Sequence, residues 1–120
     1  MGVTTVDSLR AAVVQFQHSP GDKQQNLKTV AAFVEAAASQ GVQLIVFPEC
    51  CLSGYWHLRN LNRDELEELA EPVPAGPCTC ELLRLAAAFN ITIGAGLVEQ
   101  ASGGSLFNSY VVASPDGKYH

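Results

Sequence analysis

Charged residues are few in this 120-residue sequence, and no block of like charge extends beyond a few residues. Asp, Glu, Lys and Arg make up 16% of the chain, and the net charge is −5. Because phosphate binding needs clustered Lys and Arg, this balance argues against nucleic acid as the main partner. Long apolar stretches are also missing, and a membrane span would need roughly 20 such residues. We therefore expect neither a nucleic-acid partner nor a membrane partner.

Targeting signals are missing from the N-terminal residues as well. The stretch from Met1 to Asp7 does not combine a basic end with an apolar run, so we expect no signal peptide. Gly2 follows Met1, but Val6 stands where an N-myristoylation motif needs Ser or Thr. The sequence therefore predicts a cytoplasmic protein.

The four cysteines do not have the spacing of a metal site. Structural zinc sites usually place about two to four residues between paired cysteines. Here Cys50 and Cys51 are adjacent, and Cys78 and Cys80 are one residue apart. Disulfides are rare in a cytoplasmic protein. We expect four ordinary, mostly buried thiols, and neither a bound metal nor a cofactor.

Apolar residues make up 48% of the sequence and are arranged as a strand, a helix and a second strand. The first strand is predicted over Leu9–Gln17. Asp22 caps the following helix, whose apolar positions recur at helical spacing until Gly41 ends it. The second strand is predicted over Val42–Phe47. It is apolar at every position from Leu44 to Phe47, which is typical of a parallel strand covered on both faces. These elements predict a βαβ unit.

The second half of the sequence predicts two helices and a strand pair. After a loop at 49–61, Asn62 and Glu65 form a capping-box pattern that starts an acidic helix ending near Ala70. Pro77 starts the next helix, and strands follow at 91–99 and 106–113. A Pro-Asp-Gly turn at 115–117 then begins a new extended segment, which indicates that the domain continues beyond this sequence.

Glu49 is the main candidate for a catalytic residue. It lies just past the carboxyl end of the buried strand, where open α/β sheets bind their ligands. Among Phe47, Tyr55 and Trp56 we expect its carboxylate to be partly desolvated, which would suit a general base working near neutral pH. The alternative is a surface glutamate that only ends a strand.

Several motifs occur in the order found in one enzyme family. Leu44-Ile45-Val46-Phe47-Pro48-Glu49, followed by Leu52-Ser53-Gly54-Tyr55, resembles the glutamate motif of the nitrilase superfamily of carbon–nitrogen hydrolases. The first strand (12–16), Asn26-Leu27, the strand at 94–99 and the segment 107–117 match in sequence order. The resemblance implies an α-β-β-α sandwich, of which residues 1–120 are the N-terminal half of a single domain.

The resemblance also implies a division of catalytic labour. In the family a cysteine attacks the amide or nitrile carbon, a glutamate takes the thiol proton and a lysine stabilises the oxyanion. Glu49 carries over as the base. Lys118 lies too near the preceding turn to be the lysine, and the nucleophilic cysteine belongs to the family's second half. Cys50 and Cys51 occupy variable positions of the motif, so neither is expected to be the nucleophile.

The expected substrate is a small-molecule amide or N-carbamoyl compound rather than a nitrile, and the resemblance implies a homo-oligomer. We expect Tyr55 to line the substrate pocket together with Trp56, although packing alone would explain both aromatic residues. Asn108 is expected to satisfy backbone groups near the site. The histidines at 18, 57 and 120 are interpreted as surface or loop residues.

Two other functions stay open at the level of sequence. The first is a non-catalytic α/β binding module, although no G-x-G-x-x-G motif follows the first strand. The second is an interaction subunit whose partner chain supplies the lysine and the cysteine. Such a fragment would leave apolar surface uncovered, and we expect the stripe with Leu82 and Leu83 to be part of it.

Overall fold

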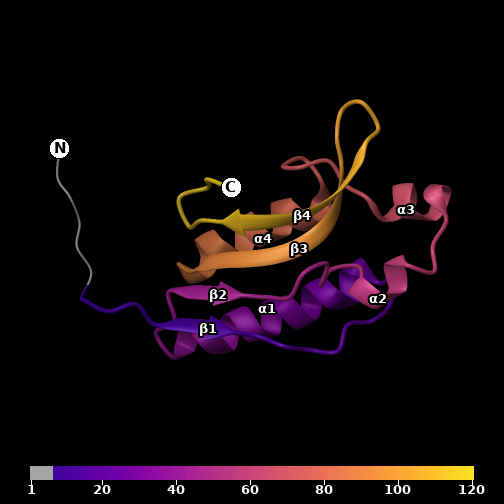
Figure 1. Ribbon diagram of the computed structural model, residues 1–120. Coiled ribbons are helices and arrows are strands. Elements are labelled where there is room, and N and C mark those ends of the chain that lie inside the picture. Colours follow the sequence, from indigo (N-terminus) through magenta and orange to yellow (C-terminus); the bar gives the residue numbers. More distant parts are fainter. Residues whose placement is uncertain (1–6) are drawn as a thin grey trace.

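The computed structural model describes residues 7–120, which contain four strands and four helices (Figure 1). The prediction of no N-terminal signal rests largely on Met1–Val6, which lie outside the described residues. In chain order the elements are β1 (Ala11–Val13), α1 (Lys23–Ser39), β2 (Leu44–Val46), α2 (Tyr55–Leu58), α3 (Arg63–Leu69), α4 (Pro77–Phe89), β3 (Thr92–Gln100) and β4 (Leu106–Ala113). No helix within 7–120 is long and apolar enough to cross a membrane.

The four strands form one sheet in the order β1-β2-β3-β4. β1 pairs in parallel with β2, so the predicted βαβ unit is confirmed. β2 also pairs in parallel with β3, whereas β3 and β4 form an antiparallel hairpin. One row across the sheet joins Val13, Val46, Gly94 and Val112.

Helices α1 and α4 contact each other and cover one face of the sheet. Buried residues of these helices and of the sheet form one hydrophobic core. From the helices it includes Val30, Val34, Leu82 and Leu85, and from the strands Ile45, Ile93 and Val111. Leu82 is fully buried and Leu83 packs against this core. The expectation that these two leucines belong to an uncovered stripe is therefore wrong, because their helix lies against the sheet.

The opposite face of the sheet is open within residues 7–120. Val13 is 84% exposed and Tyr110 is 43% exposed. In β2, Ile45 is buried against the helices, but Leu44 and Val46 are only half-buried. The prediction that β2 is covered on both faces is therefore wrong for the described residues.

Capping residues account for the positions at which the helices begin and end. Asp22 accepts a hydrogen bond from Gln25 N at 3.0 Å, and Gly41 has a positive φ of 75° just after α1. Asn62 and Glu65 form the predicted capping box at α3. The short helix α2 lies inside the segment predicted as loop, and it has no side-chain cap in the sequence to indicate it.

The turn predicted at 115–117 is present, and the residues after it return along β4. After the turn at 114–117, His120 and Val112 exchange two backbone hydrogen bonds of 2.9 Å. Glu71, which lies beside the C-terminal end of β3, is buried and forms an ion pair of 2.8 Å with Lys23. Glu71 also accepts a hydrogen bond from Cys78 N, so it joins the start of α4 to the start of α1.

Candidate active site

Glu49 lies in a tight turn that follows β2 and is held against β3. Phe47 N donates to Gly94 O at 2.8 Å, and Leu52 N donates to Gly96 O at 3.2 Å. A Cβ on Gly96 would lie 2.2 Å from Cys50 N, so only glycine permits this close approach. The turn that carries Glu49 is therefore fixed by backbone contacts with the centre of the sheet.

Asn26 holds the same turn from the other side. Its side chain is buried, and its amide nitrogen donates to Leu52 O and to Ser19 O, both at 2.9 Å. Its oxygen accepts from Ser19 N at 2.8 Å. Asn26 thereby ties the loop after β1 to the turn after Glu49. The sequence indicated Asn26 only as part of a helix start, because such long-range partners depend on the fold.

The Glu49 side chain is exposed in this chain. Phe47 points into the core, where it packs against Phe16 and Phe33, and Tyr55 and Trp56 are 48% and 63% exposed. The expectation that these three aromatic residues desolvate the carboxylate is therefore wrong for the described residues. A strand beyond β3 in the sheet supplies a polar partner instead.

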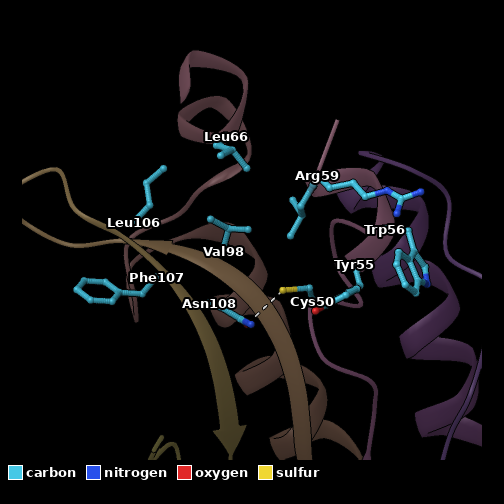
Figure 2. Close-up of a pocket in the computed structure, with 10 residues that line it drawn as sticks. Cys50, Tyr55, Trp56, Arg59, Leu66, Val98, Leu106, Phe107 and Asn108 are labelled. Carbon is cyan, nitrogen blue, oxygen red and sulfur yellow. Dashed lines mark hydrogen bonds between the residues drawn. The ribbon is translucent and has the colours of Figure 1, made fainter. Parts of the chain in front are cut away.

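Asn108 on β4 is that partner. Its amide nitrogen donates to Glu49 Oε1. Its oxygen accepts from Cys50 Sγ at 3.2 Å (Figure 2). Both contacts are to side chains, so the expectation that Asn108 satisfies backbone groups is wrong. Two residues further on, Tyr110 Oη donates to Phe47 O at 2.7 Å. Two β4 side chains thus contact the ends of the Phe47–Cys50 segment.

Two hollows lie beside these residues. The larger has a volume of about 500 Å³ and is mainly apolar, with Cys50 and Asn108 on one side and Trp56 and Arg59 on the other (Figure 2). The smaller, of about 230 Å³, is lined by Glu49 itself. Tyr55 and Trp56 line both hollows, and His18 lies in the smaller one. The structure therefore brings the two predicted site residues, Glu49 and Tyr55, to one place.

The thiols next to Glu49 are poorly suited to nucleophilic attack. Burial, together with the charge of Glu49, raises the pKa of the Cys50 thiol. Burial raises the pKa of Cys51 to about 11. Because the thiolate is the reactive form, a raised pKa lowers reactivity near neutral pH. That neither cysteine is the nucleophile stays a prediction.

The remaining polar candidates lie apart from Glu49 or contact backbone. The ammonium group of Lys118 is 3.8 Å from Asp116, on the turn that carries both residues. His57 lies against Gly21, and His18 lies against Gly54. Among residues 7–120, no group of three or more His, Cys, Asp or Glu side chains is placed to hold a metal ion.

The sequence matches the family model described as carbon-nitrogen hydrolase over residues 10–120. The chain belongs to this family. Among carbon-nitrogen hydrolase relatives, it is 32% identical over 109 residues to a nitrilase of Pyrococcus abyssi, covering 91% of this chain and 40% of that protein. It is 32% identical over 110 residues to omega-amidase NIT2 of Homo sapiens, covering 92% of this chain and 37% of that protein. The chain thus spans about two-fifths of the length of these curated relatives.

Solved structures of the same superfamily have a similar fold. Saccharomyces cerevisiae Nit3, a member of branch 10 of the nitrilase superfamily, has a TM-score of 0.75 and 27% identity, covering 93% of this chain and 43% of that one. An N-terminal amidase has a TM-score of 0.77 at 22% identity, covering 92% of this chain and 26% of that one. The predicted nitrilase-type α/β fold is therefore confirmed, with this carbon-nitrogen hydrolase chain corresponding to part of it.

Proposed function

We propose that residues 1–120 form the N-terminal half of an amidase-type carbon–nitrogen hydrolase in which Glu49 is the general base. The observation that carries the proposal is the placement of Glu49. Its turn is held by β3 and β4, beside two hollows, in a chain that belongs to the carbon-nitrogen hydrolase family. The complete hydrolase, in this proposal, is this chain together with the segment that supplies the cysteine and the lysine.

The proposed reaction has two steps. The cysteine thiol gives its proton to Glu49, and the thiolate attacks the amide carbonyl carbon while the lysine stabilises the oxyanion. The carbon–nitrogen bond then breaks, and the leaving amine takes the proton from Glu49. In the second step Glu49 takes a proton from water, which attacks the thioester, and the thiol is regenerated as the carboxylic acid leaves.

Amides or N-carbamoyl compounds are the proposed substrates, with nitriles as the less favoured class. The support comes from the relatives, several of which are named omega-amidases, while one is named a nitrilase. Tyr55 is proposed to contact the substrate, since it lines both hollows beside Glu49. We also propose a cytoplasmic homo-oligomer that needs no cofactor.

A second candidate is an interaction subunit without activity of its own. The open face of the sheet, with Val13 84% exposed, favours this candidate because it offers a surface to a complementary chain. Both candidates predict that the 120-residue chain alone hydrolyses no amide. They differ in what Glu49 does once the complementary segment is present.

The test is Glu49→Gln in the complete hydrolase. Glutamine keeps the size of the side chain and one hydrogen-bonding oxygen but cannot take a proton from the thiol. We expect single-turnover acylation to slow by about 10²–10⁴-fold, the usual contribution of a positioned general base. The melting temperature should change little, because Glu49 is exposed.

Glu35→Gln is the matched control, because Glu35 is an exposed glutamate on α1, away from the turn. It should acylate at the wild-type rate. Wild-type acylation by Glu49→Gln would remove the base assignment. A large fall in melting temperature for Glu49→Gln alone would assign a structural role to this residue.

A further inference from the structure

The Asn108 side chain bridges two adjacent residues of the Glu49 turn. A carboxylate can only accept hydrogen bonds, so the atom next to Glu49 Oε1 must be the amide nitrogen of Asn108. The amide oxygen then lies 3.2 Å from Cys50 Sγ and accepts from the thiol. The chemistry of the two partners therefore determines which way the amide is oriented.

The fold holds Asn108 on a regular strand. Asn108 pairs with Val98 in the antiparallel ladder of β3 and β4, and Tyr110 follows on the same face of β4. Tyr110 lies against Gly94 and donates to Phe47 O at 2.7 Å. The two side chains contact the turn on both sides of Pro48. A strand positions a side chain more closely than a loop does, which suits a group that must orient another.

Cys50 supplies the second point of attachment. It has a positive φ of 50°, a conformation uncommon for a residue other than glycine, and its side chain is buried. Because burial raises the pKa of this thiol, Cys50 keeps its proton near neutral pH and remains a donor to Asn108. Cys50 thus holds the amide oxygen of Asn108, while the amide nitrogen of Asn108 contacts Glu49.

We propose that Asn108 is a positioning residue that holds Glu49 Oε1 so that Oε2 faces the thiol whose proton Glu49 takes. The inference rests on the proposed function and adds a residue to it. Within residues 7–120, the hydrogen bond to Glu49 comes from Asn108 and leaves Oε2 without a protein donor. Loss of Asn108 leaves the base present but no longer held in one orientation, which slows proton transfer.

The experiment compares Asn108→Ala and Asn108→Asp with wild type in the complete hydrolase, by single-turnover acylation across a range of pH. Asp keeps the shape of Asn but replaces the donor by an acceptor oxygen, so it tests the hydrogen bond even if the alanine variant folds poorly. We expect both variants to acylate about 10–100-fold more slowly, the usual effect of losing a charge-assisted hydrogen bond.

Ser109→Ala is the matched control. Ser109 is the next residue of β4, and its hydroxyl also donates to a carboxylate, Glu99 Oε1, at 2.7 Å. This variant should acylate at the wild-type rate. Acylation by Asn108→Asp within about twofold of wild type would overturn the proposal.

A double variant separates this inference from the proposed function. If Asn108 acts through Glu49, Glu49→Gln with Asn108→Ala should acylate no more slowly than Glu49→Gln alone. Multiplying losses would contradict the inference. Should Glu49→Gln itself acylate at the wild-type rate, the proposed function fails. If Glu49→Gln acylates slowly and both Asn108 variants acylate at the wild-type rate, the proposed function is supported and only the positioning role of Asn108 is contradicted.

Discussion

Cys50 shows how single residues determine the geometry of the candidate site. Its left-handed backbone turns the chain sharply after Glu49, its thiol is buried, and its hydrogen bond reaches β4. The sequence indicated Glu49 because the surrounding motif is local. It did not indicate Asn108 as the partner of Glu49, because 59 residues separate them and their contact depends on the register of the sheet.

The four thiols should differ sharply in reactivity. Cys80 is exposed, whereas Cys50, Cys51 and Cys78 are buried and burial raises the pKa of all three. At pH 8, a pKa of about 11 leaves about 0.1% of Cys51 as thiolate. We expect a thiol-specific reagent to label Cys80 rapidly in the native chain and the other cysteines only after denaturation.

Mass spectrometry of the labelled chain checks this expectation, and Cys80→Ser should abolish the rapid phase. As pH rises toward 11, labelling of Cys51 should accelerate, because a raised pKa moves the formation of thiolate to higher pH. Rapid labelling of Cys50 at pH 8 would contradict both its burial and the assignment of the nucleophile to another segment.

Among the elements, the helix starts and the β3–β4 hairpin could be predicted more closely than β1 and β2, whereas the short helix α2 was predicted as loop. Asp22, Asn62 and Pro77 mark the starts of α1, α3 and α4 to within one residue, because caps are local hydrogen-bonding patterns. The first strand was predicted over Leu9–Gln17 but pairs only over Ala11–Val13. Strand ends depend on where a neighbouring strand stops, and the sequence of one strand does not contain that information.

β3 is the element that positions the Glu49 turn, and glycine is what allows it to do so. Gly96→Ala would place a Cβ 2.2 Å from Cys50 N and 2.9 Å from Glu49 C, both backbone atoms that cannot move aside cheaply. We expect this change to lower the free energy of unfolding by about 2–4 kcal/mol. It should also displace the turn and reduce acylation in the complete hydrolase.

Gly103→Ala is the control for this prediction. Gly103 lies in the hairpin between β3 and β4, and a Cβ there would meet nothing within 4 Å. Its effect should stay within about 0.5 kcal/mol, as for other surface changes. Chemical denaturation of both variants measures the difference. Equal stabilities would mean that β3 and the turn are not in close contact.

For the whole molecule, the open face of the sheet should govern behaviour in solution. β1 is at one edge of the sheet, and Val13 on it is 84% exposed, in the same row as Val46 and Val112. Exposed apolar edge strands favour association with other chains. We expect the 120-residue chain to self-associate at micromolar concentrations, as seen by analytical ultracentrifugation.

Val13→Lys should weaken this association, because a lysine on an edge strand opposes pairing. Ala87→Lys adds the same charge on the exposed side of α4 and should leave association unchanged. A monodisperse monomer for the wild-type chain, or equal effects of the two lysines, would show that the open face is not the surface involved.

The two β4 contacts with the Glu49 turn also have a consequence for synthesis on the ribosome. Asn108 and Tyr110 are made 59 and 63 residues after their partners Glu49 and Phe47. At roughly 5–20 residues per second, Glu49 leaves the ribosome several seconds before the strand that holds it. The contacts of β4 with the turn that carries the candidate base therefore form late in translation, and a pause between residues 50 and 108 delays them further.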